Sequence, residues 1–207
     1  MVEPQAGGWG ATATRDGESG LVVVGDGETY VMPAEVCEDR YPLLVDQFAF
    51  NLTPAGVQFA FNLTPAGAGH YRGGFGLVRD YRILCEKAEL TTTFGRHRFP
   101  PWGGVGGREG SPNGVAVIPA GHSEPVVWRG KLARYPLRRG DIVRLVTGAG
   151  GGYGDPLTRD PASVQQDIRN ELLTAEDARR LYGVVIDPVS QTVDQAATAA
   201  LRQELAS

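Results

Sequence analysis

Short apolar runs separated by turn residues dominate the first 150 or so residues of the chain. Glycine, proline or charged residues bound each run, and the run at 75–84 alternates around charged residues as a half-exposed strand does. The runs that predict strands lie at 21–24, 43–52, 75–84, 90–94, 115–118, 126–128 and 142–146. Many short strands with turns between them are typical of a sandwich or barrel-like packing of sheets.

The pattern becomes helical in the last 50 residues. Asp160 followed by Pro161 is typical of a helix start, since aspartate caps a free amide and proline needs no donor in the first turn. Further helices are predicted from the capping-box residue Thr174 to Tyr182 and behind Thr192, with a short strand at 184–186 between them. The sequence therefore predicts an α+β fold with a β-rich, glycine-dense body at 1–157 and a helical C-terminal segment at 158–207.

One ten-residue segment, QFAFNLTPAG, occurs without a change at 47–56 and again at 58–67. Identical copies indicate a recent duplication, an engineered insertion or an artefact. The repeat period of eleven is odd, so one straight strand cannot hold both copies in the same register, because side chains alternate with period two. We expect a hairpin or bulged extension; the alternative is one copy expelled as a loop.

Glycine is the unusual feature of the composition. The chain has 29 glycines in 207 residues, about twice the usual ~7%, and 20 of them lie between Gly67 and Gly154. Glycine and proline together stay below the ~25–30% typical of low-complexity chains. The middle of the chain is therefore expected to fold, with tight turns and close approaches between backbones.

Charge and hydropathy exclude two classes of partner. A net charge of −4 argues against a nucleic-acid binder, and no apolar run reaches the ~18 residues that would span a membrane. The two cysteines, Cys37 and Cys85, have no CxxC spacing, so buried free thiols are expected rather than a disulfide or a nucleophile. Without a signal peptide at the start, a cytoplasmic location is expected.

Two glycine-rich turns carry the candidate binding residues. In the stretch at 148–154, the backbone amides of Gly150, Gly151 and Gly152 could cradle an anion, although the spacing matches no nucleotide fingerprint and a structural turn is favoured. In the turn at 69–76, His70 and Arg72 precede a strand that carries Arg79. These arginines could bind a carboxylate or phosphate, or form salt bridges within the protein.

No catalytic residue can be assigned from motifs. His70, His97 and His122 lie far apart without metal-ligand spacing, so no metal site built from this chain alone is expected. Glu35 and Glu38 would lie on opposite faces of a strand, so a carboxylate dyad is not expected unless that stretch bends.

Several segments, read in order, resemble the hydantoinase B/oxoprolinase family. They are GGWGAT at 7–12 with Asp16 and Gly17, TYVMPAE at 29–35 with Glu38 and the pair YP at 41–42, AGAGHYRGGFG at 66–76 with Arg79, PWG at 101–103, the stretch 148–156, and ARRLYGVV at 178–185 with Asp194. The run at 66–76 is the most specific of them. The order and spacing fit the C-terminal part of a B-type subunit over nearly the whole chain.

The resemblance implies chemistry shared between subunits. A kinase-like A subunit uses ATP and Mg²⁺ to phosphorylate the oxygen of a cyclic amide such as a hydantoin or oxoproline, and the B subunit hydrolyses the activated species. Related carboxylases use the same activation to carboxylate a ketone. A developing phosphate calls for arginines and backbone amides, for which Arg72, Arg79 and the loop at 148–154 are the local candidates.

The sequence departs from the family pattern in two ways. It begins deep inside the pattern, so the upstream half that is expected to bind a divalent metal is absent, and the pattern has room for only one copy of QFAFNLTPAG. We therefore expect a hetero-oligomer with the A subunit and an upstream B-subunit half, and no cofactor held by this chain alone. The alternatives are the equivalent part of a ketone carboxylase and a non-catalytic docking subunit.

Overall fold

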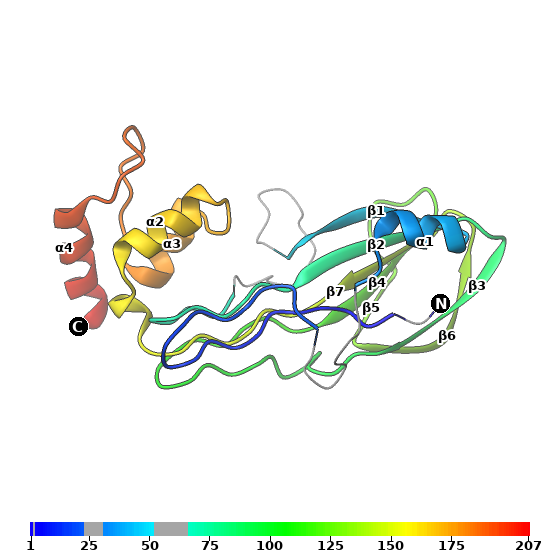
Figure 1. Cartoon of the computed structure of the whole chain (residues 1–207), viewed down its shortest axis with the longest axis horizontal. Coiled ribbons are helices and arrows are strands. Elements are labelled where there is room, and N and C mark those ends of the chain that lie inside the picture. The colour runs from blue at the N-terminus through cyan, green and yellow to red at the C-terminus, as the bar shows by residue number, and fades with distance from the viewer. Residues whose placement is uncertain (2, 23–30, 52–65) are drawn as a thin grey trace.

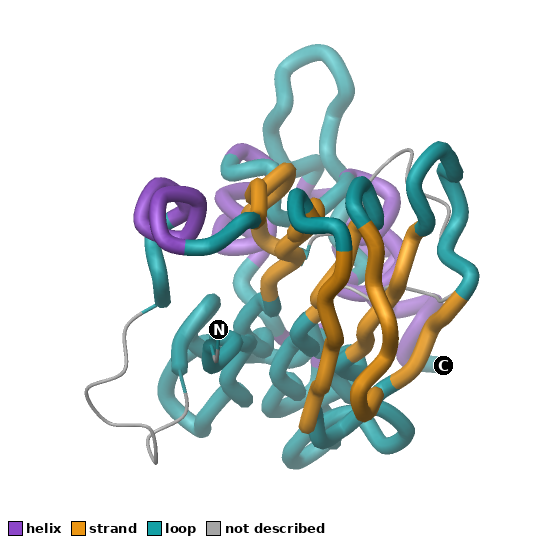
Figure 2. The backbone as a smooth tube through the Cα atoms, turned by 90° about the vertical axis from the view of Figure 1, so that its right-hand side faces the viewer, coloured by secondary structure: helices purple, strands orange, loops and turns teal. Residues whose placement is uncertain are grey.

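The computed structural model describes residues 1, 3–22, 31–51 and 66–207. These residues form an elongated molecule with three regions (Figure 1). Strands and one short helix lie at one end, extended chain without regular secondary structure fills the middle, and the C-terminal helices lie at the other end. Figure 2 looks along the molecule from the strand end.

A five-stranded antiparallel sheet forms the strand end, in the order β1-β2-β7-β4-β5. Its strands are β1 (Leu43–Phe50), β2 (Leu77–Ile83), β4 (Gly114–Ile118), β5 (Val127–Arg129) and β7 (Ile142–Val146). A second sheet pairs β3 (Lys87–Thr93) with β6 (Lys131–Arg138). The two sheets share one apolar core with Cys37 of α1 (Ala34–Arg40).

Alternation along the strands explains this core. Tyr81, Val143 and Val117 stand opposite one another across β2, β7 and β4, and all three are buried in the same cluster. The next row, of opposite orientation, places Asp80 beside Arg144, which donates two hydrogen bonds to the carboxylate at 2.8 and 2.6 Å. Successive side chains of a strand point to opposite faces, so the charged pair lies on the face away from the core.

In the strand region, two elements differ from the expectation. The stretch around Cys37 is a helix, so Glu35 and Glu38 do not lie on opposite faces of a strand; both are exposed, and Glu38 accepts a hydrogen bond from the amide of Val45 at 2.8 Å. No side chain caps this helix at Pro33, which explains why no start signal is visible in this stretch of the sequence.

The second element, β6, is not predicted by alternation because its apolar positions change phase. Leu132 and Tyr135 are three residues apart, and the β3–β6 register shifts between Leu90 and Thr92. Arg134 between them has a positive φ of 49°, which strand backbone does not adopt. Alternation with period two therefore fails at this bulge although the strand continues.

The middle region, here called the glycine bundle, consists of the segments 7–20, 66–76, 101–111 and 147–154. The last three continue β2, β4 and β7 of the sheet without a break in the chain. The segment 147–154 lies at the centre. A Cβ atom added at Gly150, Gly151 or Gly152 would lie 1.9 Å from the carbonyl oxygen of Trp9, 2.1 Å from that of Trp102 or 2.3 Å from that of Ala68, respectively.

Three successive residues of the central segment thus face three different neighbours. A backbone that makes one turn every three residues has this property, as in polyproline II, where no hydrogen bond forms within the chain. The backbone groups are satisfied by the neighbours instead: Gly150 donates to Gly74 at 2.9 Å, Gly152 donates to Arg108 at 2.9 Å, and Gly151 accepts from Ala11 at 2.8 Å. Glycine is required because the space where a side chain would stand is filled by another backbone.

The helical end contains η2 (Pro156–Thr158), α2 (Pro161–Arg169), α3 (Ala175–Tyr182) and α4 (Gln195–Ala206). The starts predicted at Asp160 and Thr174 are confirmed, since both side chains cap their helices. The third helix begins later than expected, with Asp194 instead of Thr192 as its cap. Between α3 and α4 the chain forms only an isolated bridge from Ile186 to Val193.

The helices pack on the bundle through a second apolar cluster. Ala68 of the bundle lies among the helical residues Val164, Leu181 and Tyr182. The α+β prediction is confirmed, while the division into domains at residue 157 stays a prediction. Of the repeat, only 47–51 and 66–67 are described, so the expected hairpin lies outside the described residues.

Candidate functional site

The structure packs the turn at 69–76 against the glycine loop at 150–152 but leaves Arg79 apart from them. His70 and Arg72 lie where the bundle meets the helices, whereas Arg79 lies in β2. Arg79 follows Arg72 by seven positions of extended chain, a distance of about 23 Å at ~3.3 Å per residue. They therefore belong to two different clusters.

Arg72 belongs to an arginine–aspartate cluster formed by Asp16, Arg72, Arg159 and Asp167. The Nε of Arg72 donates to both oxygens of Asp167, at 3.2 and 3.1 Å. Arg159 donates to the two oxygens of Asp16, at 2.7 and 2.8 Å, and to Asp167 at 3.0 Å. Two positive and two negative charges from four separate segments thus neutralise one another.

Local structure places each member of this cluster. Arg159 follows η2 as its C-cap, and Asp167 lies on the buried side of α2, one turn after Val164. Asp16 also accepts the backbone amide of Arg72 at 2.8 Å, which fixes the turn that carries the arginine. The cluster therefore joins two segments of the bundle, 7–20 and 66–76, to the helical end.

Electrostatics favour the ionised forms of Asp16 and Arg159. Burial alone would raise the pKa of Asp16, but hydrogen bonds from Arg159 and the charges of Arg159 and Arg72 outweigh burial and lower it. Burial would lower the pKa of Arg159, yet its bonds to Asp16 and the charge of Asp167 raise it overall. Burial also raises the pKa of the adjacent Tyr182 to about 12, so that its hydroxyl stays neutral at physiological pH.

Sequence reasoning missed Asp16, Arg159 and Asp167 as members of this cluster. One signal was present: Asp167 lies between Val164 and Ile168, where a charged residue on an apolar helical face requires a partner. The partner itself was not readable, because Arg159 and Asp16 are 143 residues apart in the chain.

Arg79 occupies a second cluster in the strand region. Its side chain is 1% exposed and forms an ion pair of 2.6 Å with Glu3, which also accepts a hydrogen bond from the hydroxyl of Tyr81. A further bond joins Arg79 to the carbonyl of Met32 at 2.8 Å, and its guanidinium lies over the ring of Phe48. Burial and the neighbouring Glu3 raise the pKa of Tyr81. The ion pair with Glu3 neutralises Arg79 within the chain.

His70 links the bundle to the helical end. Its Nδ1 lies 3.0 Å from the carbonyl oxygen and 2.9 Å from the hydroxyl of Thr158, and its own carbonyl accepts a bond of 3.2 Å from Arg159. The predicted glycine loop is likewise engaged: the amides of Gly150 and Gly152 donate to backbone carbonyls, while Gly151 is packed against Trp102. These positions serve the packing of the bundle.

The remaining expectations concern metals, thiols and membranes. Within the described ranges, no three side chains of the metal-binding types gather in one place. Cys37 is buried and Cys85 half-buried, both are free, and burial raises the pKa of Cys37. Among the helices that the structure describes, none is long and apolar enough to cross a membrane.

The chain is similar in sequence to proteins of one known family. Residues 1–156 match the family model described as hydantoinase B/oxoprolinase. The putative D-/L-hydantoinase B subunit of a Pseudomonas species is 30% identical over 171 residues, which are 83% of this chain and 27% of that protein. The caprolactamase beta subunit of Pseudomonas jessenii is 34% identical over 174 residues, 81% of this chain and 27% of that protein.

Solved structures show the same fold. ATP-dependent caprolactamase from Pseudomonas jessenii superposes with a TM-score of 0.75 and 30% identity, over 96% of this chain and 33% of that chain. Acetone carboxylase has a TM-score of 0.71 at 21% identity, over 97% of this chain and 30% of that chain. The chain thus spans between a quarter and a third of the length of these relatives, and it belongs to the hydantoinase B/oxoprolinase family.

Proposed function

We propose that this chain is the C-terminal part of the hydrolase subunit of an ATP-dependent cyclic-amide hydrolase. The observation that carries the proposal is its superposition on ATP-dependent caprolactamase over 96% of the chain at 30% identity. At that coverage, the superposed residues include the strands, the glycine bundle and the C-terminal helices. The hydantoinase relative supports the same reaction class.

In this proposal a kinase-like partner subunit uses ATP and Mg²⁺ to phosphorylate the amide oxygen of the ring. Phosphorylation makes the ring carbon reactive towards water. Water adds to this carbon, the ring carbon–nitrogen bond breaks, and hydrolysis of the acyl phosphate that remains releases phosphate and the ring-opened product. A divalent metal belongs to an upstream part of the B-type subunit. Hydantoins, oxoproline and lactams are the substrate class.

The local role of this chain is to position other parts of the subunit. Arg72, Arg79 and Arg159 already hold carboxylates, so each would have to leave an ion pair before it could bind a phosphate. Breaking a buried ion pair by removing one partner costs roughly 3–5 kcal/mol. The ion pairs of these arginines therefore support a structural role for this chain in the complex, with the substrate bound by other parts of the complex.

The test is co-expression of the tagged chain with the polypeptides encoded beside its gene, followed by assays of the purified complex. We expect ring opening of a hydantoin, oxoproline or lactam that depends on ATP, and no turnover by the 207-residue chain alone. Hydrolysis by the isolated chain would contradict the proposal.

A ketone carboxylase is the second candidate. The acetone carboxylase alpha subunit of Xanthobacter autotrophicus is 26% identical over 98% of this chain, which supports this alternative. The same complex separates the two functions, because a carboxylase would consume bicarbonate and a ketone together with ATP. A complex whose turnover is unchanged when this chain is removed would instead favour a non-catalytic docking subunit.

A further inference from the structure

An exposed row of apolar side chains lies on the hairpin at 99–110. Phe99, Trp102 and Val105 are 79%, 75% and 74% exposed. They are spaced by three residues, and Pro100 and Pro101 favour polyproline II backbone, which has three residues per turn. Phe99 and Trp102 therefore point to the same side of the first arm, and Val105 follows at the turn.

Val105 is held in an unfavourable conformation at the tip of this hairpin. Its φ is 48° and that of Gly106 is 88°, while Gly107 donates to Gly104 at 2.9 Å, as in the tight turns that favour asparagine or glycine. A β-branched residue at positive φ is strained. Asparagine would relieve the strain and also be better solvated, so neither folding nor solubility explains an exposed valine here.

The arm is rigid before anything binds to it. Arg96 stacks on the ring of Trp102 at 4.8 Å, and the backbone of Gly103 packs against that of Gly107 in the opposite arm. Two prolines restrict the chain between Phe99 and Trp102 further. A preorganised apolar row loses little conformational entropy on binding, which favours recognition.

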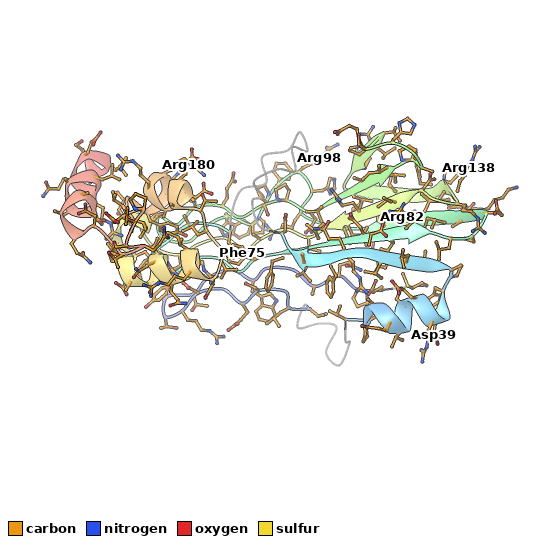
Figure 3. All side chains as sticks on the ribbon, turned by 90° about the horizontal axis from the view of Figure 1, so that it is seen from above. Asp39, Phe75, Arg82, Arg98, Arg138 and Arg180 are labelled. Carbon is orange, nitrogen blue, oxygen red and sulfur yellow. The ribbon has the colours of Figure 1, made fainter. Side chains whose placement is uncertain are left out.

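The charge beside this row is opposite to that of the whole chain. Between residues 95 and 110 there are three arginines, all exposed, and one acidic residue, Glu109, whereas the chain has a net charge of −4. Figure 3 places Arg98 along the middle of the molecule, between the strands and the C-terminal helices. A binding surface of this kind fits an apolar groove with carboxylates at its rim.

We propose that Phe99, Trp102 and Val105 form a docking surface for a partner protein chain with an apolar groove rimmed by carboxylates. The row provides the apolar contact, with Trp102 as its anchor, and Arg96, Arg98 and Arg108 provide the complementary charge. The tip of the surface lies beside Asp155, where the bundle meets the helices. The proposal rests on the proposed function only for the choice of partner in the experiment.

The experiment measures binding of the 207-residue chain to the partner subunits obtained by co-expression, together with the melting temperature of the chain alone. Val105→Asn is expected to raise the melting temperature by about 3 °C, because backbone strain is relieved, and to weaken binding about tenfold. Trp102→Ala is expected to weaken binding about a hundredfold. The matched control is Val189→Asn, since Val189 is 92% exposed on the helical end and should change neither quantity.

Binding should also weaken as NaCl rises from about 50 to about 500 mM, because the rim charges are screened. The proposal would be overturned if both hairpin variants bound the partner with unchanged affinity. It would also be overturned if the chain formed a dimer with itself and Trp102→Ala disrupted that dimer. Ring-opening activity measured on the same complexes separates the two proposals. Hairpin-dependent binding without turnover would contradict the proposed function alone, and turnover with hairpin-independent binding would contradict the docking surface alone.

Discussion

β2 and the segment 66–76 that precedes it are one continuous piece of chain, yet their neighbours contact them in different ways. In the sheet, side chains such as Tyr81, Val143 and Val117 interdigitate in a core. In the bundle, Gly73 and Gly74 meet the backbone of Gly150 and Glu18 directly. The sheet end therefore depends on the volume of its side chains, and the bundle depends on their absence.

This difference predicts opposite sensitivities to mutation. A side-chain core loses stability when atoms are removed, because a cavity remains. A backbone-packed bundle loses stability when an atom is added, because a carbonyl stands where the new atom must go.

The largest effect is expected from Gly150→Ala. Its new methyl group would lie 1.9 Å from the carbonyl oxygen of Trp9, so the central segment must shift and lose hydrogen bonds to its neighbours. We expect a loss of about 4 kcal/mol in the free energy of unfolding or failure to fold, measured by urea denaturation. Gly95→Ala is the control, since nothing lies within 4 Å of its added Cβ. Equal stability of the two variants would refute the backbone-packing description.

Asp167→Asn is expected to have the next largest effect, because it removes a negative charge held between Arg72 and Arg159. Breaking a buried ion pair costs about 3 kcal/mol. Glu89→Gln is the control, since its pair with Arg134 is exposed and should contribute about 0.5 kcal/mol or less. Hydrogen exchange should locate the loss in α2 and α3; a loss confined to the sheet would contradict the role assigned to this cluster.

Val117→Ala probes the sheet side of the comparison. Removing two methyl groups from a fully packed position should cost about 2 kcal/mol, less than the single carbon added at Gly150. Urea denaturation under the same conditions gives the comparison directly. If Val117→Ala were the more damaging change, the two regions would not differ in the way described.

The smallest effect concerns acid stability. The pKa of Asp16 is lowered in the folded chain, so the unfolded chain binds its proton at a higher pH. The stabilisation from ionised Asp16 is complete above its unfolded pKa of about 3.9 and is lost as the pH falls through the lower folded value. Urea midpoints between about pH 5 and about pH 3 should therefore fall more for wild type than for Asp16→Asn. Parallel curves for the two proteins would show that Asp16 does not contribute.

Much of the site could not be predicted because it depends on long-range pairing. Arg72 and Arg79 were recognisable as arginines in a glycine-rich turn and a strand, but which carboxylates neutralise them follows from contacts made 95 and 76 residues away. Phe99 and Trp102 led to no prediction, since exposure is not visible in an apolar pair that flanks two prolines.

The sequence by itself determined the α+β class, the starts of α2 and α3, and most strands, because alternation and capping act over a few residues. Its glycine density and ordered motifs also predicted close backbone packing and the family. Only the tertiary structure decided that the glycines of 147–154 lie at the centre of three other segments, and that the arginines are neutralised in ion pairs. A glycine allows a backbone to come close; which backbone does so depends on how the whole chain folds.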